Sequence, residues 1–102
     1  MGKKKILSER ELRGMVYPSE NDVLCVVQKM LGYDRVLARC QDGHTRTCRI
    51  RGRMKRRIWV REGDVVLVSP WDIQSDKRGE IFWRYTHSQA DQLRKQGILK
   101  LD

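Results

Sequence analysis

Hydrophobic and polar positions along the chain predict five short strands followed by a short helix. Five segments are rich in Val, Ile, Leu and aromatic residues, and turn residues such as Gly, Asp and Pro separate them. Runs of this length and composition are typical of β-strands in small all-β domains. We predict strands over residues 22–31, 35–41, 44–50, 65–70 and 80–85.

The third of these segments has a clear alternation of apolar and polar positions. Cys48 and Ile50 fall on one face, and the other face carries Thr45, Thr47, Arg49 and Arg51. An alternation with period two is the pattern of a half-buried strand.

The Asp-Gly pair at 42–43 predicts a tight hairpin between the second and third segments. With a two-residue turn, Cys40 lies opposite Thr45, and Arg39 lies opposite Arg46. Two like charges in opposite positions are unfavourable unless acids or a bound phosphate lie nearby. A different register fits the pattern equally well.

Residues 88–97, with the sequence SQADQLRKQG, predict a short helix near the end of the chain. Ser88 is the expected N-cap, Asp91 follows three residues later, and Gly97 is expected to end the helix.

The order of these elements favours an all-β fold. Five short strands at regular spacing on a basic chain are typical of a five-stranded OB-fold barrel. We expect a flexible basic N-terminal arm over residues 1–20, the barrel over 21–86, and a C-terminal helix and tail packed on the barrel over 87–102.

The charge of the chain is concentrated in one segment. The formal net charge is +9, and residues 46–61 contain eight basic residues and no acid. A solvated face usually mixes acids with bases, so this cluster favours a polyanionic partner. Membranes fit poorly, because no apolar run approaches the roughly 20 residues that span a bilayer. We therefore expect a cytoplasmic RNA-binding protein.

Arginine predominates in the basic segment, and its planar guanidinium can donate two parallel hydrogen bonds to a phosphate. Trp59 lies next to the run of bases, where its ring could stack on an unpaired base or cover one end of the barrel. Trp71 is expected to be a packing residue. The candidate RNA-binding residues are Lys3, Lys4, Lys5, Arg39, Arg46, Arg49, Arg51, Arg53, Lys55, Arg56, Arg57, Trp59 and Arg61.

The sequence gives little support for a metal site, a redox function or catalysis. The chain has three cysteines and no C-x-x-C pair, which favours reduced thiols. Cys40, His44 and Cys48 offer three ligands where structural zinc takes four, and the hairpin would separate the two sulfurs by roughly 10 Å. Neither His44 nor His87 has an obvious nucleophile or paired carboxylate beside it in the sequence. We expect no cofactor, no metal and no enzymatic activity, although a small nuclease assembled from distant residues stays open.

Several motifs together resemble the archaeal form of the translation initiation factor 1A family. They are KMLG, C-x-DG, C-x-IRG followed by a basic run and IW, then GD before a strand, and DK before WRY. The resemblance covers about 80 residues, from Asp22 to the last helix. Other small barrels share the fold but not this ordered set of motifs.

The resemblance implies a fold, partners and a role. It implies an OB fold that binds the small ribosomal subunit near the decoding A site, stabilises initiator methionyl-tRNA binding and assists start-codon selection, without chemistry or a metal. It also implies that Trp59 and the basic loop contact RNA, that Lys3–Lys5 belong to a mobile arm, and that the protein is a monomer whose partners include other initiation factors. Eukaryotic members continue into an acidic tail, whereas this chain ends at Asp102, so contacts that depend on that tail are not expected.

The residues alone leave alternatives open. A general single-stranded RNA-binding OB module would bind any unpaired RNA with similar affinity. A structural ribosomal protein would stay on the subunit through a high-salt wash, whereas an initiation factor would be released.

Overall fold

The computed structural model describes residues 16–32, 34–51 and 60–101. Its centre is a closed barrel in which the strands follow the order β1-β2-β3-β5-β4. All neighbouring strands are antiparallel except β3 and β5, which are parallel. The elements are β1 (Val23–Met30), β2 (Arg35–Cys40), β3 (Thr45–Ile50), β4 (Val65–Pro70), β5 (Arg78–Arg84) and α3 (His87–Lys95). The expected five-stranded OB-type barrel with a short C-terminal helix is confirmed.

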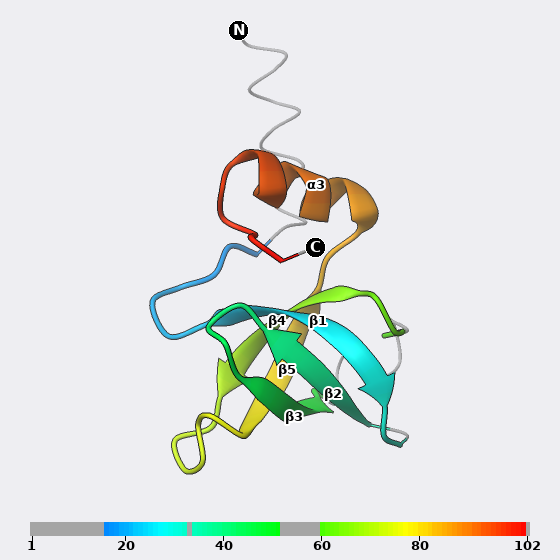
Figure 1. Cartoon of the computed structure of the whole chain (residues 1–102), viewed down its shortest axis with the longest axis vertical. Coiled ribbons are helices and arrows are strands. Elements are labelled where there is room, and N and C mark those ends of the chain that lie inside the picture. The colour runs from blue at the N-terminus through cyan, green and yellow to red at the C-terminus, as the bar shows by residue number, and fades with distance from the viewer. Residues whose placement is uncertain (1–15, 33, 52–59, 102) are drawn as a thin grey trace, which may run out of the picture.

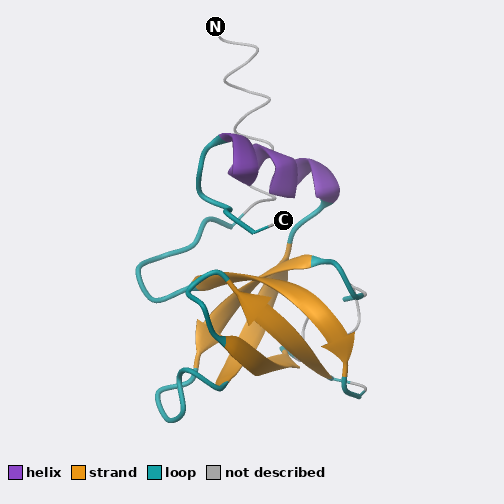
Figure 2. Cartoon of the chain, in the orientation of Figure 1, coloured by secondary structure: helices purple, strands orange, loops and turns teal. Residues whose placement is uncertain are grey.

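Helix α3 lies over one end of the barrel, and the loop between β4 and β5 projects from the side farthest from it (Figure 1). The same view coloured by secondary structure separates the strands of the barrel from the helix above them (Figure 2).

Apolar residues fill two clusters, one inside the barrel and one between the barrel and α3. Strand β4 contributes to both: Val66 and Val68 face the barrel interior, while Val65 and Leu67 face the helix side. This double burial explains why the sequence of β4 is continuously apolar and does not alternate.

The β2–β3 hairpin differs by one residue from the two-residue turn expected from the sequence. Arg39 lies opposite Thr45, and Ala38 lies opposite Arg46. The cause is the turn, in which Cys40 and His44 are hydrogen-bonded and Gly43 has φ +94°. A glycine in the left-handed region allows a three-residue loop.

The predicted faces of β3 are nevertheless confirmed, since Cys48 and Ile50 are buried whereas Thr45 and Arg49 are exposed. Strand β5 begins at Arg78, two residues earlier than expected.

Helix α3 begins after Thr86, so the prediction of Ser88 as N-cap is wrong. The Thr86 hydroxyl accepts a hydrogen bond from the Gln89 N–H, and the Gln89 side chain accepts one from the Thr86 N–H. This reciprocal capping box satisfies two amides at the start of the helix. Gly97, which was expected to end the helix, follows the C-cap Gln96.

The expectation of three reduced thiols is wrong for two of them. Cys25 of β1 lies directly opposite Cys40 of β2, and the two form a disulfide. Cys48 is a free, buried thiol. The pairing depends on strand register, which C-x-x-C spacing does not report.

In the described part of the chain, no helix is long and apolar enough to cross a bilayer.

Candidate nucleic-acid interface

The outward-facing positions of β2, β3 and β5, together with the residue that directly follows β3, place arginines on one side of the barrel. Strand alternation places these side chains outside because the intervening residues fill the core. We call this surface the arginine face, and it comprises the exposed residues Arg35, Arg39, Arg49, Arg51 and Arg78.

Arg49 lies at the centre of the arginine face. Strand β3 runs between β2 and β5, so Arg49 has Arg35 as its cross-strand partner on one side and Glu80 on the other. Its Nε lies 3.9 Å from a carboxylate oxygen of Asp34, a loose contact that leaves just over half of its side chain exposed. Two arginines opposite each other are unfavourable in an isolated sheet. A bound phosphate would relieve this repulsion.

Two arginines of the face are held over aromatic rings. The Arg51 guanidinium lies 5.4 Å from the centre of the Phe82 ring, and its Nε donates to Glu80 Oε2 at 3.2 Å. Arg78 lies 5.9 Å from the centre of the Trp71 ring. A guanidinium held over a ring keeps N–H groups at its edge for a further partner.

A shallow depression of about 370 Å³ lies between these two stacks. It is lined by Arg51, Ser69, Pro70, Trp71, Asp72 and Glu80. Trp71, expected from the sequence to be a packing residue, is 39% exposed.

Arg46, one of the candidate RNA-binding residues, lies inside the structure. It is 3% exposed, and its guanidinium donates to both carboxylate oxygens of Asp42 at 2.9 and 2.7 Å. Its Nε also donates to the Ser75 carbonyl oxygen at 2.6 Å. The hydrogen bonds from Arg46 lower the pKa of Asp42, so the pair stays ionised. Arg46 has the same strand parity as Cys48 and Ile50, and this parity was the signal that it points inward.

The remaining candidates divide into two groups. Arg39, Arg49, Arg51 and Arg61 are exposed. Lys3, Lys4, Lys5, Arg53, Lys55, Arg56, Arg57 and Trp59 lie outside the described residues. Sequence reasoning missed Arg35 and Arg78, although Arg35 shares its strand alternation with Arg39.

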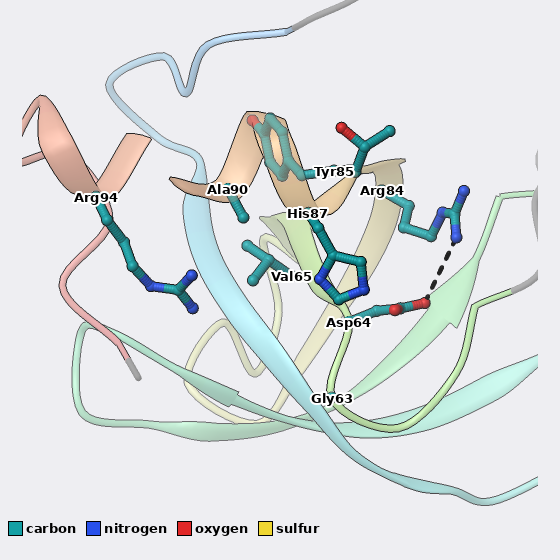
Figure 3. Close-up of a pocket in the computed structure, with 9 residues that line it drawn as sticks. Gly63, Asp64, Val65, Arg84, Tyr85, His87, Ala90 and Arg94 are labelled. Carbon is teal, nitrogen blue, oxygen red and sulfur yellow. Dashed lines mark ion pairs between the residues drawn. The ribbon is translucent and has the colours of Figure 1, made fainter. Parts of the chain in front are cut away.

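A second concave region lies between α3 and the barrel (Figure 3). This pocket of about 220 Å³ is lined by Gly63, Asp64, Val65, Arg84, Tyr85, Thr86, His87, Ala90 and Arg94. Its charged groups have protein partners: Arg84 lies 3.9 Å from Asp64, and Arg94 donates to the Leu101 carbonyl oxygen at 3.2 Å.

Tyr85, which is one of the residues that line this pocket, is held as a neutral hydrogen-bond donor. Burial is the main cause that raises the pKa of its hydroxyl, which donates to the Val16 carbonyl oxygen. The Tyr85 hydroxyl is therefore not an activated nucleophile. Within the described ranges, no cluster of three or more His, Cys, Asp or Glu residues could hold a metal ion.

The family model described as translation initiation factor 1A / IF-1 matches residues 12–101. The chain belongs to this family. The match covers the whole barrel and α3, so every strand of the arginine face lies within the matched region. The resemblance to translation initiation factor 1A is therefore confirmed, and with it a role in translation initiation, which is a non-enzymatic class of function.

Several curated relatives in this family come from archaea. Translation initiation factor 1A of Methanococcus aeolicus is 55% identical over 80 residues, which cover 78% of this chain and 76% of the relative. Translation initiation factor 1A 1 of Haloquadratum walsbyi is 53% identical, over 92% of this chain and the whole of the relative. The Methanopyrus kandleri protein is 49% identical, over 97% of this chain and 86% of its own length.

Among solved structures, the chain resembles translation initiation factor IF-1 from the wolbachia endosymbiont strain TRS of Brugia malayi. The TM-score is 0.50 at 24% identity, and the match covers 78% of this chain and 97% of that one. This likeness supports the barrel fold alone.

Proposed function

We propose that this chain, within the role in initiation that its family has, binds the small ribosomal subunit near the decoding A site. There it stabilises binding of initiator methionyl-tRNA and assists start-codon selection. It acts in the cytoplasm as a monomer, beside other initiation factors, and without catalysis of its own.

The observation that carries this proposal is the arginine face. Five exposed arginines share one side of the barrel, and two of them, Arg49 and Arg51, contact the acids Asp34 and Glu80. Such a surface attracts phosphates because counterions are released when arginines replace them on the RNA. The aromatic rings under Arg51 and Arg78 hold two of the cations in fixed positions.

The proposed RNA-contacting set joins these arginines to the basic residues named from the sequence. It comprises Arg35, Arg39, Arg49, Arg51, Arg61 and Arg78, with Lys3, Lys4, Lys5, Arg53, Lys55, Arg56, Arg57 and Trp59. Arg46 is left out because its guanidinium is buried against Asp42 and Ser75.

Sedimentation with purified small ribosomal subunits tests the proposal. The protein is titrated onto subunits across a salt series, with and without an excess of unstructured RNA. We expect stoichiometric binding that survives the competitor and is lost reversibly at high salt. Binding that the competitor abolishes would mean a general RNA-binding module, and binding that resists a high-salt wash would mean a structural ribosomal protein.

Competition with a second ligand tests the position on the subunit. An aminoglycoside that binds the decoding site should lower the affinity of the factor, because the two occupy neighbouring RNA. Unchanged affinity at saturating aminoglycoside would contradict the A-site part of the proposal while leaving subunit binding intact.

A further inference from the structure

The loop between β4 and β5, residues 71–77, exposes apolar side chains at the surface. Ile73 is 79% exposed and Trp71 is 39% exposed, and both are among the large hydrophobic residues that the described part of the chain leaves open to solvent. In Figure 1 this loop, coloured yellow, projects from the barrel away from α3. An exposed aliphatic side chain beside an exposed tryptophan is a common composition for the centre of a binding surface.

The loop is held in one conformation by hydrogen bonds at its base and its tip. The Trp71 N–H donates to the Arg78 carbonyl oxygen at 3.1 Å, and the N–H groups of Lys77 and Arg78 both donate to the Gln74 carbonyl oxygen at 2.9 Å. Gln74 has a backbone φ of +60°, a value that residues other than glycine rarely adopt. Such a residue persists only where its surroundings determine the backbone.

Arg46 fixes the far side of the same loop. Its hydrogen bond to the Ser75 carbonyl oxygen comes from a guanidinium that Asp42 already holds through two contacts. A loop ordered before it binds loses little conformational entropy on association. Ile73 is therefore presented on a pre-formed support.

The charge of the loop is opposite to that of the rest of the protein. Residues 71–77 carry a net charge of −1, from Asp72 and Asp76 against Lys77, with Arg78 at the base of the loop, whereas the whole chain carries +9. Loops of OB folds often bind oligonucleotides, but two aspartates beside Ile73 repel a phosphate backbone. An aliphatic side chain also offers a nucleobase neither a stacking plane nor a hydrogen bond. Acidic charge around an apolar tip complements a basic protein surface.

We propose that the 71–77 loop is a protein-docking surface, which adjoins the arginine face where Arg78 lies over Trp71 and differs from that face in charge. It inserts Ile73 into an apolar pocket of a protein whose rim carries Lys or Arg residues facing Asp72 and Asp76. Trp71, held under Arg78, covers the edge of that contact. The inference rests on the proposed function, since the partner is a basic protein that this chain meets when it is bound to the small subunit.

A cross-linking experiment identifies the class of partner. A photoreactive aliphatic diazirine residue replaces Ile73, and the protein is bound to purified small subunits, irradiated and digested with ribonuclease. We expect a discrete adduct whose added mass is that of a protein and survives digestion. The same group at Arg49, on the arginine face, is the control and should give an adduct that ribonuclease reduces to nucleotides.

Charge and apolar variants give an independent readout of affinity. Asp72→Asn with Asp76→Asn should weaken binding to the subunit at least threefold, while binding to naked small-subunit RNA stays equal or becomes tighter. Ile73→Ser should weaken subunit binding at least fivefold at an unchanged melting temperature, and Ile73→Leu should restore it. Asp91→Asn with Glu20→Gln, which removes two exposed acids outside the loop, is the matched charge control.

The outcomes separate this inference from the proposed function. If the wild type fails to bind subunits against competitor RNA, the proposed function fails and the docking surface fails with it. If the wild type binds but the position-73 adduct is RNA, or the Asp72/Asp76 variant binds subunits more tightly, the docking surface alone is overturned.

Discussion

Arg46 and Ser75 lie 29 positions apart in the sequence and are joined by a 2.6 Å hydrogen bond from Nε to the carbonyl oxygen. The bond ties the β2–β3 hairpin to the loop between β4 and β5. Asp42 holds the other edge of the same guanidinium. One buried side chain thus fixes the relative positions of two loops.

Replacing Arg46 with Ala should destabilise the fold by about 2–3 kcal/mol, since hydrogen bonds to a charged group are lost and the Ser75 carbonyl loses its partner. Urea unfolding measures the change. Arg39→Ala, on the neighbouring strand but exposed, should change the free energy of unfolding by less than about 0.5 kcal/mol. Equal effects of the two substitutions would contradict a special role for Arg46.

The Arg46–Asp42 pair should make stability depend on acidic pH. The folded state lowers the pKa of Asp42 below its ordinary value of 3.8. The contribution is therefore fully present above that value and is lost as pH falls through the lower, folded-state pKa. The difference in unfolding free energy between wild type and Asp42→Asn should be constant from pH 7 to pH 5 and shrink toward pH 2. A difference that grows on acidification would show that the sign is wrong.

The Cys48 thiol should not react with alkylating reagents in the folded protein. Burial raises the pKa of its thiol to about 12, so little thiolate exists near neutral pH. With the Cys25–Cys40 disulfide intact, iodoacetamide at pH 8 should label no cysteine in the native protein and one after unfolding. Mass spectrometry counts the additions, and prior reduction should raise the unfolded count to three. Rapid labelling of the native protein would contradict the buried position of Cys48.

The disulfide should stabilise the barrel chiefly by restricting the unfolded chain. It joins residues separated by 15 positions, and a loop of that size corresponds to about 3 kcal/mol in the chain-entropy description. Reduction should lower the urea midpoint accordingly. Cys25→Ser gives a variant in which reductant should have no further effect. A wild type that is equally stable with and without reductant would remove this contribution.

The arginine face should dominate the salt dependence of RNA binding. Changing Arg35 and Arg49 together to Ala should raise Kd and reduce the magnitude of the slope of log K against log salt by about 1–2, since each lost phosphate contact contributes roughly 0.7–0.9. Filter binding to small-subunit RNA across a salt series measures the slope. Lys95→Ala with Lys100→Ala removes the same charge elsewhere and is the control. Equal slopes for the two double variants would make the effect one of net charge and not of this surface.

The strands could be predicted from the sequence because the patterns that mark them are local. Turn residues and apolar runs mark where strands end, and the alternation in β3 correctly assigned its two faces. The same alternation, applied to Arg46, would have placed that residue inside. The correct helix cap could also have been found from local spacing. Thr86 is followed three residues later by Gln89, which is the capping-box pattern, whereas Ser88 is followed at that spacing by Asp91.

The features that could not be predicted from the sequence depend on contacts between residues of different elements. The hairpin register depends on the left-handed conformation of Gly43, and an Asp-Gly pair is compatible with loops of either two or three residues. The Cys25–Cys40 disulfide follows from the pairing of β1 with β2, and Trp71 meets Arg78 only because a loop folds back on itself.

The fold class, the concentration of positive charge and the family could all be inferred from the order of residues, because composition, periodicity and motif order are properties of the linear chain. Which arginines face solvent, which cysteines pair and where Ile73 is displayed became known only from the folded barrel. Those outcomes depend on strand register and barrel closure, and a shift of one residue in register turns a side chain from the surface to the core.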